Sequence, residues 1–130
     1  MPSIFTKIIN GEIPCYKVAE DELNFAFLDI NPNSKGHTLC VPKKEVDKIW
    51  DLSQEDYSKL MEFSRKVALA IESSIPCERV GMTVIGLEVP HVHVHLIPLH
   101  SMKNATFQHK ESLESEEFAH IASKISEHLK

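Results

Sequence analysis

One short stretch, residues 91–98, constrains the fold more than any other part of this chain. It alternates histidine with apolar residues and reads His-Val-His-Val-His-Leu-Ile-Pro. Successive side chains of a β-strand point to opposite faces of the sheet. The alternation therefore predicts a strand with one apolar face, which packs into a core. The opposite, wetter face carries three histidines: His91, His93 and His95.

The chain is long enough for one domain with its own core. It has 130 residues, of which 42% are hydrophobic and 25% are charged, as in ordinary soluble proteins. We expect a single domain over residues 1–130. The formal net charge of −5 argues against nucleic acid or an anionic membrane as a partner. A small anionic substrate is compatible with it, because a pocket can be locally basic.

The cysteines and the N-terminus bear on the cellular location. The chain has three widely spaced cysteines with no Cys-x-x-Cys pair: Cys15, Cys40 and Cys77. An odd number argues against a disulfide framework and favours reduced thiols. The first seven residues lack the pattern of a signal peptide, and no stretch is apolar enough for a membrane span. These features predict a cytoplasmic protein.

Hydrophobic periodicity predicts five strands and three main helices. The strands are expected over residues 16–20, 24–30, 37–41, 80–86 and 91–98. The helices are expected over residues 4–9 after a Ser3 cap, from Ser53 to about Ser73, and from a cap at Ser115. Short turns favour an α+β fold with a five-stranded antiparallel meander sheet, a long helix between strands and a C-terminal helix. The long helix can also be a crossover, which would change the strand order.

Three interpretations compete for the histidine row. An ordinary surface strand is one, although the regular spacing and the apolar opposite face argue against it. A metal site is the second, since His-x-His pairs are common zinc ligands. Alternate strand residues lie about 6.7 Å apart, so one ion would take only two of the rings and need ligands such as His37 or His100. Covalent catalysis is the third.

Covalent catalysis by a histidine at phosphorus sets three chemical requirements. One ring nitrogen of the nucleophile must be held as a donor, so that the other keeps its lone pair. Donors must reach the phosphate oxygens, and the leaving group needs a proton. A central histidine flanked by two others can supply much of this set. We therefore expect His93 to be the nucleophile.

Several stretches of the chain carry the pattern of one family. Residues 91–97 read His-x-His-x-His followed by apolar residues, and segments 4–14, 27–32 and 36–44 precede them in the expected order. Together they resemble the histidine triad (HIT) family, in its Hint-like branch. The resemblance implies a HIT-like fold and cleavage at the α-phosphorus of purine nucleoside phosphoramidates or dinucleoside polyphosphates. The reaction would pass through a nucleotidyl-histidine intermediate.

The resemblance also implies roles for individual residues. His93 becomes nucleotidylated, His95 contacts the phosphate or the leaving group, and His91 helps to orient the nucleophile. His37 lies near the phosphates, and Asp29 holds the ribose hydroxyls, a task that suits a carboxylate because it accepts two hydrogen bonds. The apolar base pocket maps to five residues: Ile4, Phe5, Ile8, Phe27 and Ile30. As alternatives, Asp29 can begin a turn, His37 can be a strand-end residue and the apolar residues can be plain core.

The resemblance further implies a homodimer that binds a purine nucleotide such as AMP without a cofactor. Some bacterial members carry Cys-x-x-Cys as half of a zinc site, whereas this chain has Ser3 and Thr6, so we expect no structural zinc. The link at residues 85–90 is shorter than the family's usual polar loop and contains Glu88. An acid beside an anionic phosphate is unfavourable. A catalytically weak nucleotide-binding or scaffolding protein is therefore the alternative, and a metal-dependent hydrolase is another.

Overall fold

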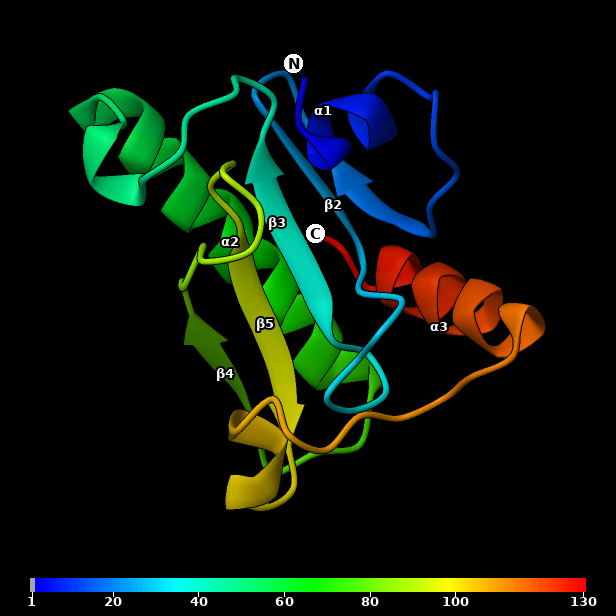
Figure 1. The fold of residues 1–130 in the computed structure, drawn as a ribbon. Coiled ribbons are helices and arrows are strands. Elements are labelled where there is room, and N and C mark those ends of the chain that lie inside the picture. Colours follow the sequence, from blue (N-terminus) through cyan, green and yellow to red (C-terminus); the bar gives the residue numbers. More distant parts are fainter. Residues whose placement is uncertain (1) are drawn as a thin grey trace.

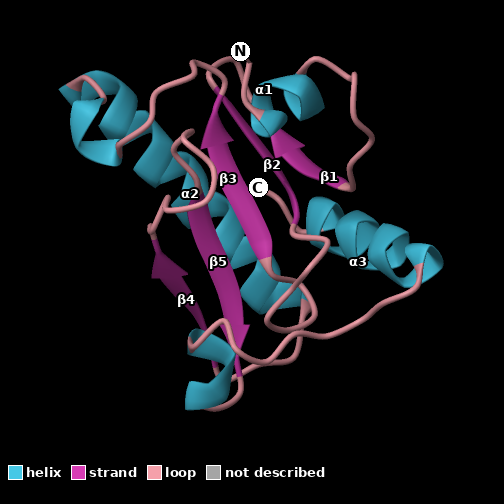
Figure 2. Cartoon of the chain, viewed as in Figure 1, coloured by secondary structure: helices cyan, strands magenta, loops and turns pink. Residues whose placement is uncertain are grey.

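One five-stranded antiparallel sheet organises the chain (Figures 1 and 2). A computed structural model describes residues 2–130, so Met1, part of the N-terminal segment considered above, lies outside the described residues. The strands are β1 (Lys17–Glu20), β2 (Asn24–Leu28), β3 (Thr38–Pro42), β4 (Arg79–Thr83) and β5 (Val94–Leu99). The helices are α1 (Ile4–Ile9), α2 (Gln54–Ser74) and α3 (Ser115–Glu127), with short 3-10 turns η1 (Ile49–Asp51) and η2 (Met102–Ala105).

The order of strands across the sheet is β1-β2-β3-β5-β4, and every neighbouring pair is antiparallel. The predicted antiparallel sheet with its helices is confirmed, but the last two strands depart from a simple meander. The chain leaves β3, runs along one face of the sheet as α2 and re-enters at the edge as β4 (Figure 1). Strand β5 then returns between β3 and β4. The long helix is thus a crossover, and the histidine strand has a neighbour on each side.

The ladder of β5 begins later than the sequence pattern indicated. The strand starts at Val94, so His91 and His93 precede it. The backbone N–H of Val92 donates instead to the carbonyl of Val46 at 2.8 Å, in the loop after β3. The alternation of side chains nevertheless continues through this segment, because Val92 lies in the main core whereas His91 and His93 lie beside Phe5 of the smaller apolar cluster.

The helices begin where the sequence supplies caps. Ser3 accepts a hydrogen bond from the N–H of Thr6 at 3.0 Å, and Ser53 accepts one from Asp56 at 3.1 Å. Helix α3 differs from the expectation by one residue, because Glu114 occupies the cap position and Ser115 is the first helical residue.

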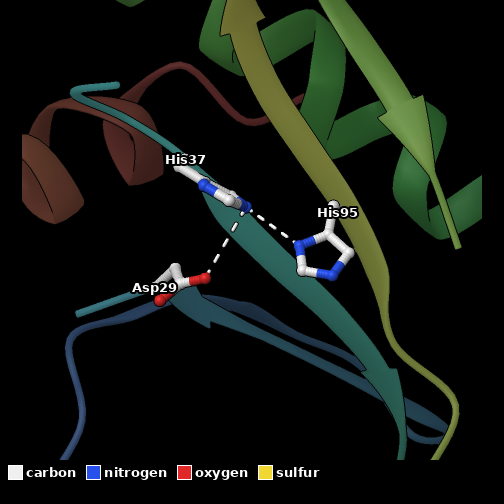
Figure 3. A group of neighbouring side chains, drawn as sticks. All are labelled: Asp29, His37 and His95. Atoms are coloured by element: carbon white, nitrogen blue, oxygen red, sulfur yellow. Dashed lines mark hydrogen bonds and ion pairs between the residues drawn. The ribbon is translucent and has the colours of Figure 1, made fainter. Parts of the chain in front are cut away.

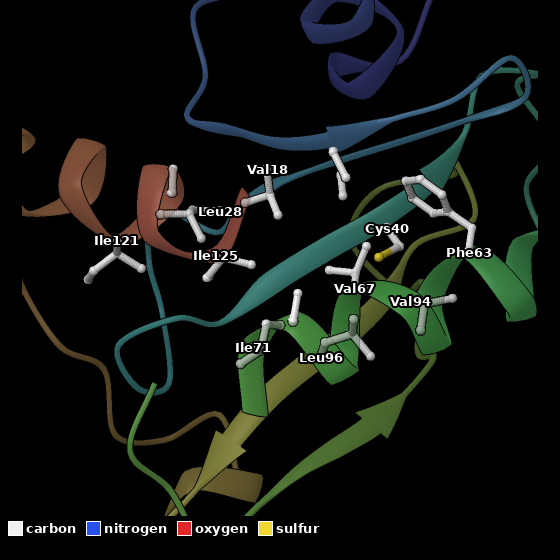
Figure 4. Packing of buried hydrophobic residues seen from close by; sticks show 14 of the residues in the cluster. Val18, Leu28, Cys40, Phe63, Val67, Ile71, Val94, Leu96, Ile121 and Ile125 are labelled. Carbon is white, nitrogen blue, oxygen red and sulfur yellow. The ribbon is translucent and has the colours of Figure 1, made fainter. Parts of the chain in front are cut away.

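The main core lies between one face of the sheet and helices α2 and α3 (Figure 4). Six residues in or next to the central strands lie in this core and are at most 2% exposed: Ala26, Leu28, Cys40, Val92, Val94 and Leu96. They pack against the apolar stripes of the two helices: Leu60, Val67 and Ile71 of α2, and Ile121 and Ile125 of α3. The apolar face predicted for the histidine strand is therefore confirmed.

The other face of the sheet carries a smaller apolar cluster: Phe5, Phe25, Phe27, Leu39 and Val41. The histidines share this face and are covered, since His91 is 0% exposed and His93 and His95 are 7% exposed. The expectation of a wet histidine face is wrong. Alternation shows which side chains share a face, whereas the residues that cover them, such as Phe5, come from distant parts of the chain.

Two further sequence expectations concern the thiols and the membrane. Cys15, Cys40 and Cys77 form no disulfide in the described chain. Within residues 2–130, no helix combines the length and the apolar character needed to cross a membrane.

Truncation of Leu60 to alanine should lower the free energy of unfolding by about 2–5 kcal/mol, because a fully buried side chain leaves a cavity when it is shortened. Leu69 on the same helix is 50% exposed, and Leu69→Ala should cost less than about 1 kcal/mol. Denaturant unfolding followed by circular dichroism measures both values. Equal losses in the two variants would contradict the packing of α2 described above.

Candidate active site

His93 has one ring nitrogen engaged and the other available. Its Nδ1 lies 2.7 Å from the backbone carbonyl oxygen of His91. A carbonyl oxygen only accepts hydrogen bonds, so Nδ1 carries the hydrogen and donates it. In the neutral ring Nε2 then keeps its lone pair, and no hydrogen-bond partner for it occurs within residues 2–130. This is the ring state that a histidine nucleophile requires.

A second backbone group sets the tautomer of two more rings. The N–H of Asn33 donates to Nδ1 of His37 at 3.0 Å, so the hydrogen of neutral His37 sits on Nε2. That Nε2–H donates to Nδ1 of His95 across 3.0 Å (Figure 3). The hydrogen of His95 is consequently on Nε2, which makes no hydrogen bond within the described chain. His95 thus offers a donor close to His93, whose ring centroid is 5.0 Å away.

Burial keeps His37 and His95 neutral. Desolvation, followed by repulsion from His95, lowers the pKa of His37 to about 3. Desolvation, followed by repulsion from His93, lowers the pKa of His95 to about 4. Because His37 is uncharged, the 3.7 Å contact between its Nε2 and Oδ2 of Asp29 is not an ion pair. The two rings therefore form a neutral hydrogen-bond relay at physiological pH.

His91 is held through both ring nitrogens. Its Nε2 donates to the carbonyl of Pro42 at 2.8 Å, and its Nδ1 accepts from the hydroxyl of Ser3 at 2.6 Å. The carboxylate of Glu45 accepts from the backbone N–H of Ser3 at 2.7 Å and so fixes that residue in turn. These contacts hold the backbone whose carbonyl engages His93. The sequence indicated Ser3 only as a helix cap, and Glu45 gave no signal at all.

Asp29 begins a turn with one carboxylate oxygen and faces His37 with the other. Its Oδ1 accepts from the backbone N–H of Asn31 at 2.8 Å, as in an Asx turn. Its Oδ2 points toward His37 (Figure 3). Burial raises the pKa of the Asp29 carboxyl, the Asn31 hydrogen bond opposes this, and the negative charge of Glu88 adds to the rise. Glu88, in the link at residues 85–90, makes the smallest of the contributions to this pKa.

The donor atoms of Asp29, His37 and His95 lie within 4.8 Å of one another, which could hold a metal ion. The tautomers argue against this use, because Nε2 of His37 carries a hydrogen while its Nδ1 accepts from backbone. The 3.0 Å between the two imidazole nitrogens is also short. Two nitrogen ligands of tetrahedral zinc, with bonds of about 2.1 Å, lie about 3.4 Å apart. The exposed His100 is not part of this group.

The residues expected to form a base pocket divide into two sets. Phe5 and Phe27 are buried in the smaller apolar cluster, and Ile8 packs against it. The ring centroids of Phe5 and His93 are 4.9 Å apart, so this cluster borders His93. Ile4 and Ile30 are 48% and 72% exposed and lie outside the cluster.

The segment after β5 contributes residues that sequence reasoning missed. The stretch 100–112 reads as polar and irregular, yet the ring of Phe107 lies 5.0 Å from that of His95 and 6.0 Å from that of His37. Phe107 has φ 63°, an uncommon conformation for a residue other than glycine. A lone aromatic residue in a polar stretch was the available signal. Lys110, three residues further on, donates to Oδ1 of Asn33 at 2.7 Å.

NMR titration should show His37 and His95 uncharged from pH 8 down to about pH 5, because their pKa values are lowered to about 3 and about 4. In the unfolded chain a histidine takes up its proton near pH 6.5. The contribution of each neutral ring to the stability of the fold is therefore complete above that pH and decreases as the pH falls. For each ring, the free energy of unfolding should then fall by up to about 1.4 kcal/mol per pH unit as the pH decreases from about 6.5 to about 4. A His95 signal that titrates near pH 6.5 in the folded protein would contradict the neutral relay.

Known proteins share both the sequence and the fold of this chain. Residues 10–102 match the family model described as HIT domain. The chain is 43% identical over 100 residues to adenosine 5'-monophosphoramidase hnt1 of Schizosaccharomyces pombe, a match that covers 75% of this chain and 74% of that protein. It is 34% identical over 137 residues to Protein hit of Bacillus subtilis, with 97% and 93% covered.

Solved structures agree with these relationships. The crystal structure of a Hit-like protein from Bartonella henselae matches with a TM-score of 0.85 at 29% identity, and covers 98% of this chain and 96% of that chain. A HIT family protein from Bacillus anthracis matches with a TM-score of 0.74 at 35% identity, and the match covers 98% of this chain and 96% of that chain. The family model spans most of the sequence, and the fold and the histidine row agree with it: the chain belongs to the histidine triad (HIT) family.

Proposed function

We propose that this HIT protein is a nucleotide hydrolase or transferase that cleaves at the α-phosphorus of purine nucleotides. The observation that carries the proposal is the 2.7 Å hydrogen bond from Nδ1 of His93 to the backbone, which leaves its Nε2 as a nucleophile. The relationship to an adenosine 5'-monophosphoramidase at 43% identity supports the hydrolase class. The candidate substrates are nucleoside phosphoramidates and dinucleoside polyphosphates.

The proposed reaction has two steps. In the first, Nε2 of His93 forms a bond to the α-phosphorus while the bond to the leaving group breaks, and the leaving group keeps the electron pair. In the second, water attacks the same phosphorus, the N–P bond breaks, and the nucleoside monophosphate leaves. A proton that an amine leaving group takes up in the first step is replaced by one that water gives up in the second. The Nε2–H of His95 is available to donate to the charge that develops at oxygen.

The nucleoside is proposed to lie between Asp29 and the smaller apolar cluster. Oδ2 of Asp29 is not used by the turn and can accept a ribose hydroxyl. Phe5 lies next to His93 and packs against Phe27, and Ile8 packs against the same cluster, to which we assign the base. The exposed Ile4 and Ile30 form the rim of this pocket in the proposal.

Glu88 favours a second candidate, a nucleotide-binding or scaffolding protein with weak turnover. Its charge acts on Asp29 and would also oppose an anionic phosphate near the same carboxyl. The two candidates share the binding site and differ in whether the His93 adduct forms. A metal-dependent hydrolase, the further alternative, is disfavoured by the tautomer of His37.

A homodimer is part of the proposal. Strand β4 is an edge strand of the described sheet, and side chains on or near it are exposed: Met82 at 44%, Ile85 at 48% and Leu87 at 90%. An unpaired strand edge with apolar neighbours can pair with a second copy of the chain. The single domain over residues 1–130, the cytoplasmic location and the lack of a cofactor stay predictions.

Mixing the protein with an adenosine phosphoramidate should add one adenylyl group to the intact mass, because the first step leaves the nucleotide on His93. His93→Ala should form no adduct and lose about a thousandfold or more in kcat. The exposed His120 on α3 gives a matched control, and His120→Ala should behave as wild type. An adduct on the His93→Ala protein would refute the assignment. Tight AMP binding by wild type with neither adduct nor turnover would favour the weak-turnover candidate.

Asp29→Asn should lower kcat/KM for an adenosine substrate by about 10- to 100-fold and leave the 2′,3′-dideoxy substrate nearly unchanged, because the carboxylate acts on the ribose hydroxyls. Asparagine keeps the Oδ1 that accepts from Asn31, so the turn is preserved. Asp21→Asn is the control, since Asp21 caps a similar turn at Asn24 on another part of the chain. Steady-state kinetics measure the effect, and equal losses on both substrates would assign Asp29 to the turn alone.

A further inference from the structure

We propose that the cavity lined by Lys110 and Asn33 is the subsite for the leaving group, and that Lys110 binds phosphate there. The enzyme then prefers substrates whose leaving group is a phosphate chain over substrates whose leaving group is an amine. This inference rests on the proposed function and narrows its substrate class.

Lys110 lies at the end of a continuous row of aromatic and imidazole rings that crosses the site. Ring centroids are 4.9 Å apart between Phe5 and His93, 5.0 Å between His93 and His95, and 5.0 Å between His95 and Phe107. The ammonium group of Lys110 lies 4.8 Å from the centroid of Phe107. Phe5 marks the nucleoside end of this row. The part of the substrate beyond the α-phosphorus is therefore expected at the opposite end, beyond His95.

A cavity of about 450 Å³ lies at that opposite end. Its lining is mostly polar and includes Asn33, Lys103, Gln108, His109, Lys110 and Glu111. Such a lining suits phosphate groups better than a purine base, and the volume is in the range of small-molecule sites. Another cavity, of about 310 Å³, lies between the β1–β2 turn and α2 and is lined by neither Lys110 nor Asn33, so it does not adjoin this end of the row.

The reacting centre needs a positive charge that His37 and His95 do not supply. His37 and His95 are neutral at physiological pH, as burial dictates. Within residues 2–130, Lys110 is the one lysine or arginine whose charge acts on His37, His95 and Asp29 alike. A cation whose charge acts on these residues can also stabilise the negative charge of a phosphate chain.

Lys110 is held in place without being neutralised. Its Nζ donates to the uncharged amide oxygen of Asn33 at 2.7 Å. An ammonium group has three hydrogens, so two are available to a ligand. No carboxylate lies within ion-pair distance of Lys110 in the part of the chain that the structure describes. Asn33 also donates its backbone N–H to His37, and it thus connects the cation to the histidine relay.

The chemistry of the first step agrees with this placement. When Nε2 of His93 bonds to the α-phosphorus of a polyphosphate, the bridging P–O bond breaks and the oxygen keeps the electron pair. The departing phosphate is a stable anion, whereas a departing amine must gain a proton. A neutral imidazole such as that of His95 donates a hydrogen bond readily but gives up its proton reluctantly. A lysine beside neutral histidines therefore matches an anionic leaving group.

Calorimetry with two ligands tests the subsite directly. AMP ends at the α-phosphate, whereas α,β-methylene-ADP extends one phosphate further and resists cleavage at the α-phosphorus. Lys110→Gln should weaken binding of the ADP analogue about tenfold and change AMP binding by less than about twofold. Lys110→Arg should restore most of the loss. Lys66→Gln removes the same charge from exposed α2 and should change neither affinity.

Steady-state kinetics provide the second measurement. Lys110→Gln should lower kcat/KM for a diadenosine polyphosphate about tenfold, with the loss reduced at high salt, and spare an adenosine phosphoramidate. Equal weakening of both ligands by Lys110→Gln, or no weakening of either, overturns the subsite and leaves the proposed function standing. Failure of the wild-type protein to bind AMP overturns the proposed function and this inference together.

Discussion

The carbonyl of His91 and the N–H of Asn33 each hold one imidazole ring in a single tautomer. The carbonyl of His91 leaves a lone pair free on Nε2 of His93. The N–H of Asn33 places the hydrogen of His37 on Nε2, which donates to Nδ1 of His95 and so leaves the hydrogen of His95 on its Nε2. A ring nitrogen with a free lone pair and a hydrogen-bond donor therefore lie in neighbouring rings. Backbone groups suit this task because a carbonyl oxygen cannot donate and an amide N–H cannot accept, so each contact is compatible with only one tautomer of the neutral ring. Everything proposed for the reaction depends on these two hydrogen bonds.

Burial then fixes the charge of the site. The interior position of β5 and the aromatic rings of Phe5 and Phe107 exclude water from the histidines, and desolvation keeps His37 and His95 uncharged. Neutral rings suit nucleophilic attack and hydrogen-bond donation, but they provide no cation for a phosphate. The positive charge comes from Lys110, in a segment that the sheet does not include. The fold thus separates the proposed nucleophile, His93, from the positive charge of Lys110, and the proposed leaving-group subsite depends on this separation.

Much of the fold could be predicted from short-range patterns. Alternation identified the apolar face of β5, and Ser3 and Ser53 marked two helix starts because capping involves residues three apart. The strand order was harder to predict, because the hydrophobic pattern of α2 is the same whether the helix joins neighbouring strands or crosses over to a distant one. Among the site residues, the histidine row and Asp29 were found from their spacing and resemblance. Asn33, Glu45, Phe107 and Lys110 carried no comparable pattern.

The sequence by itself determined which side chains share a face, because the two-residue period of a strand is a local property. It also determined that three imidazoles would lie in a row. Only the tertiary structure decided what those imidazoles do. The hydroxyl of Ser3 reaches His91 across 88 positions, and the side chain of Asn33 meets Lys110 across 77. Such contacts depend on how distant segments close over the sheet, and that closure sets the tautomer, the burial and the charge of each ring.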